Sequence, residues 1–203
     1  MRVFIIFILF SVFNITHSQY GWNVQNSGTT QKLNSISNTY PHTYLWAAGN
    51  NGTILVTTNG GINWLTQNSG TSNNLNSIKF VTPYKGFASG NNGTILRTTD
   101  GGITWVTLTT GTSMNLYTIS FDYYVWPDSV YTLYAAGQNG TIIKTTNFGV
   151  SWFSQNSGTT YDIHAITVFY YNDVWMAGAN GTILTTSNGG NSWNIVNSGT
   201  MYR

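Results

Sequence analysis

The side chains that could do chemistry are few in this chain of 203 residues. Its carboxylates are all aspartates, since glutamate is absent, and they stand at Asp100, Asp122, Asp128, Asp162 and Asp173. Hydrolysis of a glycosidic bond needs two carboxyl groups that flank the scissile bond. The only nearby pairs are Asp122 with Asp128 and Asp162 with Asp173, and each lies in what we interpret as an ordinary loop or strand edge. The sequence therefore favours a protein that is not a hydrolase.

Metal ligands and catalytic nucleophiles are equally scarce. Asp162 and His164 are two residues apart and share one face of an expected strand, but no third ligand is visible, and exposed polar alternation explains them more simply. Serine is abundant, yet no nucleophile elbow surrounds a candidate. Cysteine is absent, which excludes disulfides and thiol chemistry. We therefore expect no catalytic residue, no metal and no cofactor.

Composition describes a globular chain with little charge. Hydrophobic residues make up 41% and aromatic residues 15% of the sequence, which is enough to fill a sizeable core. Charged residues make up only 6%, and the formal net charge is +2. Such a charge is too small to hold a polyanion, so we expect no nucleic-acid partner.

The N-terminus has the pattern of a secretory signal peptide. Arg2 precedes an apolar run at residues 3–13 and then a polar tail, so we expect a leader at 1–18 and a mature chain at 19–203. An uncleaved membrane anchor is the alternative, but the run is shorter than the roughly 20 residues that a span needs. We expect a secreted or extracytoplasmic protein, in the periplasm or at the cell surface, with no membrane span after cleavage.

Four internal repeats organise the rest of the chain. The motif GTIL or GTII begins at Gly52, Gly93, Gly140 and Gly181, at spacings of 41, 47 and 41 residues. A period near 41 residues is typical of a supersecondary unit. In the second unit, strand-forming residues fall at 75–80, 86–90, 94–99 and 104–109, and Asn-Gly between the second and third runs predicts a tight hairpin.

The sequence therefore predicts an all-β protein built of four-stranded antiparallel blades. Near-continuous apolar runs suit small sheets that are covered on both faces, as in a β-propeller. A β-helix or another solenoid is the alternative architecture, although its repeats are usually shorter.

Each unit also contains a short motif that resembles the Asp-box, S/T-x-D-x-G-x-T-W. The copies occupy 57–64, 98–105, 145–152 and 186–193, and only the second has the acid. Asp or Asn can accept backbone N–H bonds inside the turn, Gly permits the bend and Trp packs into the core, so the expected role is structural. The residues are Thr57, Asn59, Gly61, Trp64; Thr98, Asp100, Gly102, Thr104, Trp105; Thr145, Asn147, Gly149, Trp152; Thr186, Asn188, Gly190 and Trp193.

The whole repeat resembles the propellers of the photosystem II assembly and stability factor family, over residues 22–200. The resemblance implies a ring of about seven blades, but the same blade also occurs in sialidases, so function does not follow from it. Sialidases are known for an arginine triad and a Tyr-Glu pair. Beyond the leader this chain has only Arg97 and Arg203 and no glutamate. We expect a non-enzymatic binding or scaffolding module with a protein or glycan partner, the alternative being a sialidase-like glycoside hydrolase fragment or relative.

Two departures from the repeat carry further expectations. The third unit is longer by six residues, in a segment that holds Tyr123, Tyr124 and Trp126, and these aromatics are candidates for ligand contact or for covering the end of the blade. A Trp-led segment at 21–29 precedes the first complete unit, so a closing strand occurs once too often for a closed ring of four. We therefore expect a partial ring that continues in a longer product or self-associates.

Overall fold

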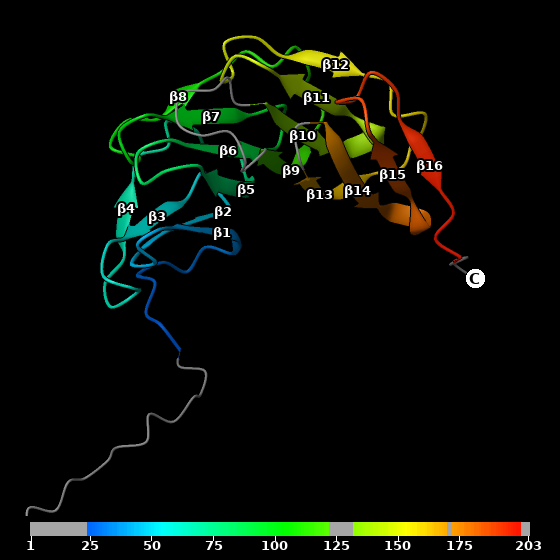
Figure 1. Ribbon diagram of the computed structural model, residues 1–203. Helices are drawn as coiled ribbons and strands as arrows, with labels where there is room; N and C mark the ends of the chain where they lie inside the picture. The colour runs from blue at the N-terminus through cyan, green and yellow to red at the C-terminus, as the bar shows by residue number, and fades with distance from the viewer. Residues whose placement is uncertain (1–23, 122–131, 170–171, 200–203) are drawn as a thin grey trace, which may run out of the picture.

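The computed structural model describes residues 24–121, 132–169 and 172–199. Figure 1 shows four sheets that follow one another along an open arc, with the first and the last sheet at its two ends. Each sheet has four antiparallel strands in sequence order from one edge to the other, and successive sheets pack through their first strands. The chain is thus all-β, with four propeller blades in a partial ring, as the repeats predict.

We number the blades from the N-terminus. Blades 1 and 2 contain β1 (Leu33–Thr39), β2 (Tyr44–Gly49), β3 (Ile54–Thr57), β4 (Leu65–Gln67), β5 (Leu75–Phe80), β6 (Gly86–Gly90), β7 (Ile95–Thr98) and β8 (Val106–Thr107). Blades 3 and 4 contain β9 (Leu116–Phe121), β10 (Leu133–Gly137), β11 (Ile142–Thr145), β12 (Phe153–Gln155), β13 (Ile163–Phe169), β14 (Asp173–Gly178), β15 (Ile183–Thr186) and β16 (Asn194–Val196). Single 3₁₀ turns, Gln138–Gly140 and Ala179–Gly181, join the second and third strands of blades 3 and 4. No described helix is long and apolar enough to cross a membrane.

The Asn-Gly turns form the hairpins that the sequence predicts. Asn51 has φ 53° and Gly52 has φ 65°, and the N–H of Thr53 donates to the carbonyl of Asn50 at 3.1 Å. Positive φ at both central residues is the type I′ geometry that matches the twist of a β-hairpin. A Cβ on Gly52 would also collide with the carbonyl oxygen of Thr71, so glycine is required for space as well as for φ.

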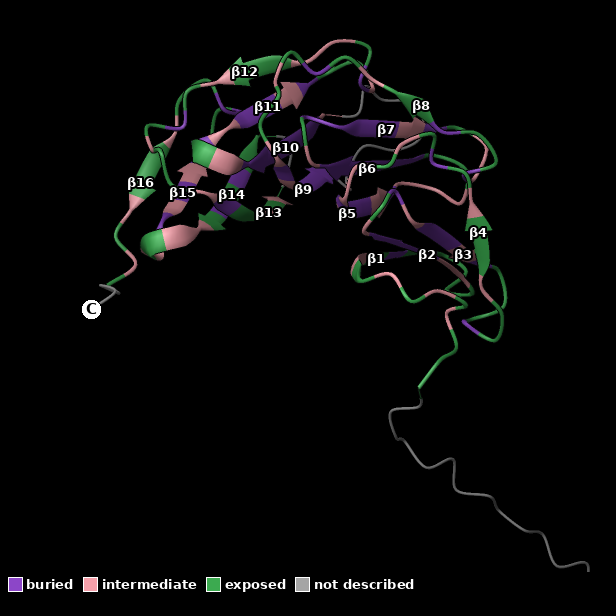
Figure 2. Cartoon of the chain, turned by 180° about the vertical axis from the view of Figure 1, so that it is seen from behind, coloured by how far each residue is buried: buried purple, intermediate pink, exposed green. Residues whose placement is uncertain are grey.

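The core lies between blades rather than inside any one of them. Figure 2 shows buried residues concentrated on the strands of the two middle blades. Three apolar clusters each join one blade to the next: Trp46, Ala48 and Ile54 with Leu75, Ile78, Phe80, Ala88, Leu96 and Trp105; Phe87 and Ile95 with Leu116, Ile119, Phe121, Leu133, Ala135 and Ile143; Tyr134, Ala136 and Ile142 with Ile163, Val174, Met176 and Leu184. Each blade is therefore stabilised by its neighbours, and among the described residues the two end blades have one such interface instead of two.

Two expectations about strands need correction. The run at 104–109 forms only the two-residue strand β8. In the Trp-led N-terminal segment, Trp22 lies outside the described residues, and residues 24–29 are not a strand. The physical reason is that no described sheet lies before blade 1, so the backbone of residues 24–29 has no described sheet edge to pair with.

Candidate functional site

The Asp-box of blade 2 is a closed hydrogen-bonded turn. The Thr98 hydroxyl donates to Oδ1 of Asp100 at 2.8 Å and accepts the N–H of Gly102 at 2.9 Å. The same carboxylate oxygen accepts the N–H of Thr104 at 2.9 Å. This backbone donor, with further bonds from Thr104 and Thr98, holds the pKa of Asp100 below its ordinary value. Oδ1 of this carboxylate is thus engaged inside the turn.

The other three boxes make the same bonds without a charge. Asn59, Asn147 and Asn188 each accept the backbone N–H of the residue four positions later, at 3.0, 2.9 and 3.0 Å. The paired hydroxyls come from Thr57, Thr145 and Thr186, and they accept the N–H groups of Gly61, Gly149 and Gly190. The acid is therefore dispensable for this geometry.

Two of the box tryptophans tie their blade to the preceding one. Nε1 of Trp105 donates to Oε1 of Gln67 at 3.3 Å, and Nε1 of Trp193 donates to Gln155 at 3.2 Å. Sequence reasoning missed these glutamines, although the repeated QNSGT that starts at Gln25, Gln67 and Gln155 was a signal for them.

The third box lacks this tie. Leu108 lies against Gly149, where a glutamine lies against the equivalent glycine in blades 2 and 4. The buried Nε1 of Trp152 accordingly has no partner among the described residues.

The described acids do not form a hydrolytic pair. Asp162 immediately precedes Ile163, which pairs with Gly178, whereas Asp173 pairs with Phe169 at the other end of the same two strands. At a rise of about 3.3 Å per residue the two aspartates are roughly 20 Å apart. Glycosidases hold their carboxyl groups about 5 to 9.5 Å apart. Asp122 and Asp128 lie outside the described residues.

One cluster of titratable groups joins blades 3 and 4. The ring of Tyr117 stacks on that of His164 with centroids 5.2 Å apart, and its hydroxyl donates to Oδ2 of Asp162 at 3.4 Å. The other oxygen of Asp162 accepts the N–H of Asn139 at 2.9 Å. Desolvation and the negative charge of Asp162 raise the pKa of Tyr117. Within the described ranges no three His, Cys, Asp or Glu residues gather to hold a metal ion.

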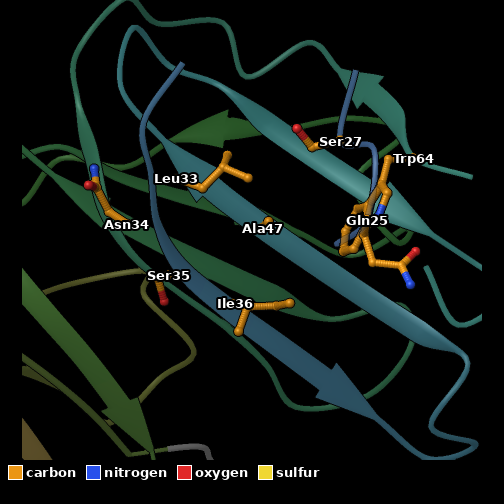
Figure 3. A pocket seen from close by; sticks show the side chains of 8 residues that line it. All are labelled: Gln25, Ser27, Leu33, Asn34, Ser35, Ile36, Ala47 and Trp64. Atoms are coloured by element: carbon orange, nitrogen blue, oxygen red, sulfur yellow. The ribbon is translucent and has the colours of Figure 1, made fainter. Parts of the chain in front are cut away.

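An apolar hollow of about 480 Å³ opens on the outer face of blade 1. Figure 3 shows Leu33, Ile36 and Ala47 along this face, with Trp64 beside Gln25 at its edge. Ser27, Asn34 and Ser35 complete the lining. Among the described residues no sheet packs on this face, so these apolar residues line an open hollow rather than an interface between blades.

The opposite end of the arc has an aromatic surface on blade 4. Phe169 and Trp175 expose 51% and 43% of their surface. The register pairs Thr167 with Trp175 and Trp175 with Thr185, so these three side chains share one face of the sheet. Tyr123, Tyr124 and Trp126, which the sequence nominated for ligand contact, lie outside the described residues.

Comparison with known proteins agrees with this architecture. A family model described as photosynthesis system II assembly factor YCF48 matches residues 8–99. In structure, the chain is similar to YCF48 from Cyanidioschyzon merolae, with 19% identity and a TM-score of 0.65, over 86% of this chain and 59% of that one. The chain is a β-propeller whose repeats resemble those of the photosystem II assembly factor family. This confirms the resemblance that the repeats indicate.

Other propellers share the fold at low identity. A structure described as YCF48 bound to D1 peptide has 18% identity and a TM-score of 0.52, over 86% of this chain and 71% of that one. The GH74 enzyme of Niastella koreensis has 15% identity and a TM-score of 0.66, over 84% of this chain and 31% of that one. A search by sequence of curated proteins gave no match. This propeller thus spans only part of the length of the structures it resembles.

Proposed function

We propose that this propeller is a non-enzymatic module that binds a protein partner outside the cytoplasm. The observation that carries the proposal is the use of the polar residues: the four boxes engage their Asp and Asn side chains in turns. The described acids that remain, Asp162 and Asp173, lie roughly 20 Å apart, too far for paired catalysis. The peptide-bound YCF48 structure supports a protein as the class of partner.

A glycan partner or a glycoside hydrolase is the second candidate. The GH74 neighbours favour it, since they show that enzymes are built on this architecture. Against it stand the absence of glutamate from the sequence and the spacing of the described aspartates. We assign the export of the module to the leader at 1–18, which has the charge and apolar run of a signal peptide.

The first test asks whether the protein hydrolyses glycosides. Purified protein is incubated with fluorogenic sialosides and a panel of common glycosides, and we expect no turnover above buffer. Hydrolysis that Asp162→Asn or Asp173→Asn abolishes would refute the non-enzymatic assignment.

Partner contact is tested on the long loop of the third unit. We expect the combined replacement of Tyr123, Tyr124 and Trp126 by Ala to weaken binding to a peptide library displayed on an array. The control is Tyr84→Ala, an exposed tyrosine between β5 and β6, which is the equivalent connection in blade 2. Peptide binding that survives the triple replacement would contradict the loop assignment.

A further inference from the structure

The three interfaces within the arc share one feature. The second strand of each blade places an aromatic side chain against the following blade, namely Trp46, Phe87 and Tyr134, each at most 1% exposed. The ring of Trp46 stacks on Phe80 with centroids 3.7 Å apart. We call this residue the knob of its blade.

Blade 4 has a knob that no described residue covers. Trp175 occupies the position of Trp46 in the repeat, between Val174 and Met176 on β14, and it is 43% exposed. The other side of the same sheet is buried against blade 3 through Val174, Met176 and Leu184. The exposure of Trp175 therefore results from the missing neighbour and not from a poorly formed blade.

Blade 1 has the matching receptor. Where blade 1 meets blade 2, the knob Trp46 of blade 1 belongs to a cluster with Leu75, Ile78, Ala88 and Trp105 of blade 2. The residues at the same repeat positions of blade 1 are Leu33, Ile36, Ala47 and Trp64, and these line the hollow in Figure 3. The hollow is thus the place where the knob of a preceding blade would lie.

We propose that two copies of this chain associate head to tail, with Trp175 of one copy in the blade 1 hollow of the other. The interface is continuous with those inside the arc, each of which joins a knob face to a receptor face. The association is separate from the partner binding proposed above. The formal charge is +2 and only 6% of the residues are charged, so electrostatic repulsion between two copies is small.

Two polar contacts of the internal interface have equivalents in the proposed one. Between blades 1 and 2, the hydroxyl of Ser37 accepts the N–H of Phe80 at 3.0 Å. In the proposed interface, Thr167 on blade 4 of one copy has the repeat position of Ser37. Asn38 on blade 1 of the other copy has the repeat position of Phe80. Asn38 is a polar substitute for the aromatic on the receptor side, so this interface is less apolar than those within the arc.

The indole of the knob has a second polar contact. Nε1 of Trp46 donates to the carbonyl of Gly101 at 3.0 Å. In the pair of copies Nε1 of Trp175 donates to the carbonyl of Gly60, the residue equivalent to Gly101.

One segment must move when the copies join. Gln25 already lies over Gly61 on blade 1, as Gln67 lies over Gly102 on blade 2, so the place of a preceding fourth strand is taken. β16 of the arriving copy belongs at the same place. β16 is held to β15 by three residue pairs, whereas residues 24–29 form no strand, so displacement of this N-terminal segment from blade 1 is the less costly change.

Cysteine cross-linking tests the orientation, because the natural chain has no cysteine. Thr167→Cys and Asn38→Cys are made in separate, differently tagged full-length chains, mixed and mildly oxidised. We expect a disulfide in the mixture, because Thr167 and Asn38 occupy contacting positions across the internal interfaces. Ile103→Cys, exposed on the box of blade 2, replaces Asn38→Cys in the control mixture, which we expect to remain uncoupled.

Each outcome decides the proposal. If Thr167→Cys chains alone form a disulfide as efficiently as the mixture does, blade 4 of one copy contacts blade 4 of the other. That result would overturn the head-to-tail proposal. Equal coupling to Ile103→Cys, or a monomer that yields no disulfide, would also overturn it. In sedimentation, we expect Trp175→Lys to weaken self-association roughly 30-fold, the effect of losing a buried aromatic hot spot, while Ile103→Lys leaves it unchanged. If the Trp175→Lys variant associates as strongly as the natural chain, Trp175 is not part of the interface and the proposal is wrong.

Discussion

Replacing Trp105 by Ala should remove a large part of the stability of the arc. Trp105 is 8% exposed, packs edge-on against Phe80 with centroids 5.9 Å apart, and donates its N–H to Gln67 of the preceding blade. A buried tryptophan removes about 200 Å² from water, which at about 25 cal/mol per Å² is worth roughly 5 kcal/mol, part of which the remaining methyl retains. We therefore expect a loss of about 3 to 5 kcal/mol in the free energy of unfolding.

The assay is thermal and urea unfolding followed by far-ultraviolet circular dichroism. For a chain of this size the loss corresponds to a fall in Tm of about 6 to 20 °C. Trp64→Ala is the matched control, since Trp64 has the same box position in a blade with no predecessor and is only partly buried. We expect it to cost about 1 to 2 kcal/mol. Equal losses for the two variants would refute the view that contacts between blades carry the stability.

Further predictions concern the turns. Asp100→Asn should change the free energy of unfolding by about 0.5 kcal/mol or less at neutral pH, because three boxes make the same bonds with Asn; a large loss in urea unfolding would assign the acid another role. In acid, the lowered pKa of Asp100 means that its stabilising contribution is present above the ordinary value of 3.8 and is lost as the pH falls through the folded-state pKa; an acid titration of Asp100→Asn should lack this step. Gly93 has φ 65° and an added Cβ would meet the carbonyl oxygen of Thr112, so Gly93→Ala should lower the free energy of unfolding by at least about 2 kcal/mol. Gly111 has φ 75° but no atom within 4 Å of an added Cβ, so Gly111→Ala should lower it by about 1 kcal/mol. Equal Tm values for the two variants would show that the backbone near Thr112 moves to accommodate the methyl group.

The hairpins and several strands could be predicted from the sequence, because turn residues and alternation within one repeat determine them. Asn-Gly pairs fixed the hairpins, and the expected strands at 75–80 and 86–90 coincide with β5 and β6. Contacts between neighbouring blades were not predictable in this way. The stack of Tyr117 on His164 and the reach of Gln67 to Trp105 depend on how one blade is placed on the next, and strand pattern within a repeat does not encode that placement.

The candidate site was the least predictable part. The hollow of blade 1 and the exposure of Trp175 arise because two repeat positions lack a neighbouring blade, although their sequences are those of core residues. The same repeat positions are therefore buried in the middle of the arc and exposed at its ends. The repeat count indicated a partial ring, but it did not show which side chains that ring leaves uncovered.

The hairpin turns also govern how the chain ages chemically. Asn followed by Gly is prone to deamidation, in which the glycine amide nitrogen attacks the Asn side chain. In the first two turns the N–H groups of Gly52 and Gly93 are held in hydrogen bonds of 2.9 Å to the carbonyls of Asn73 and Met114, and Asn51 and Asn92 are fixed at positive φ. The folded protein should keep these amides intact, whereas unfolding exposes them to attack. Deamidation at these two turns should therefore increase with the total time that the chain has spent unfolded.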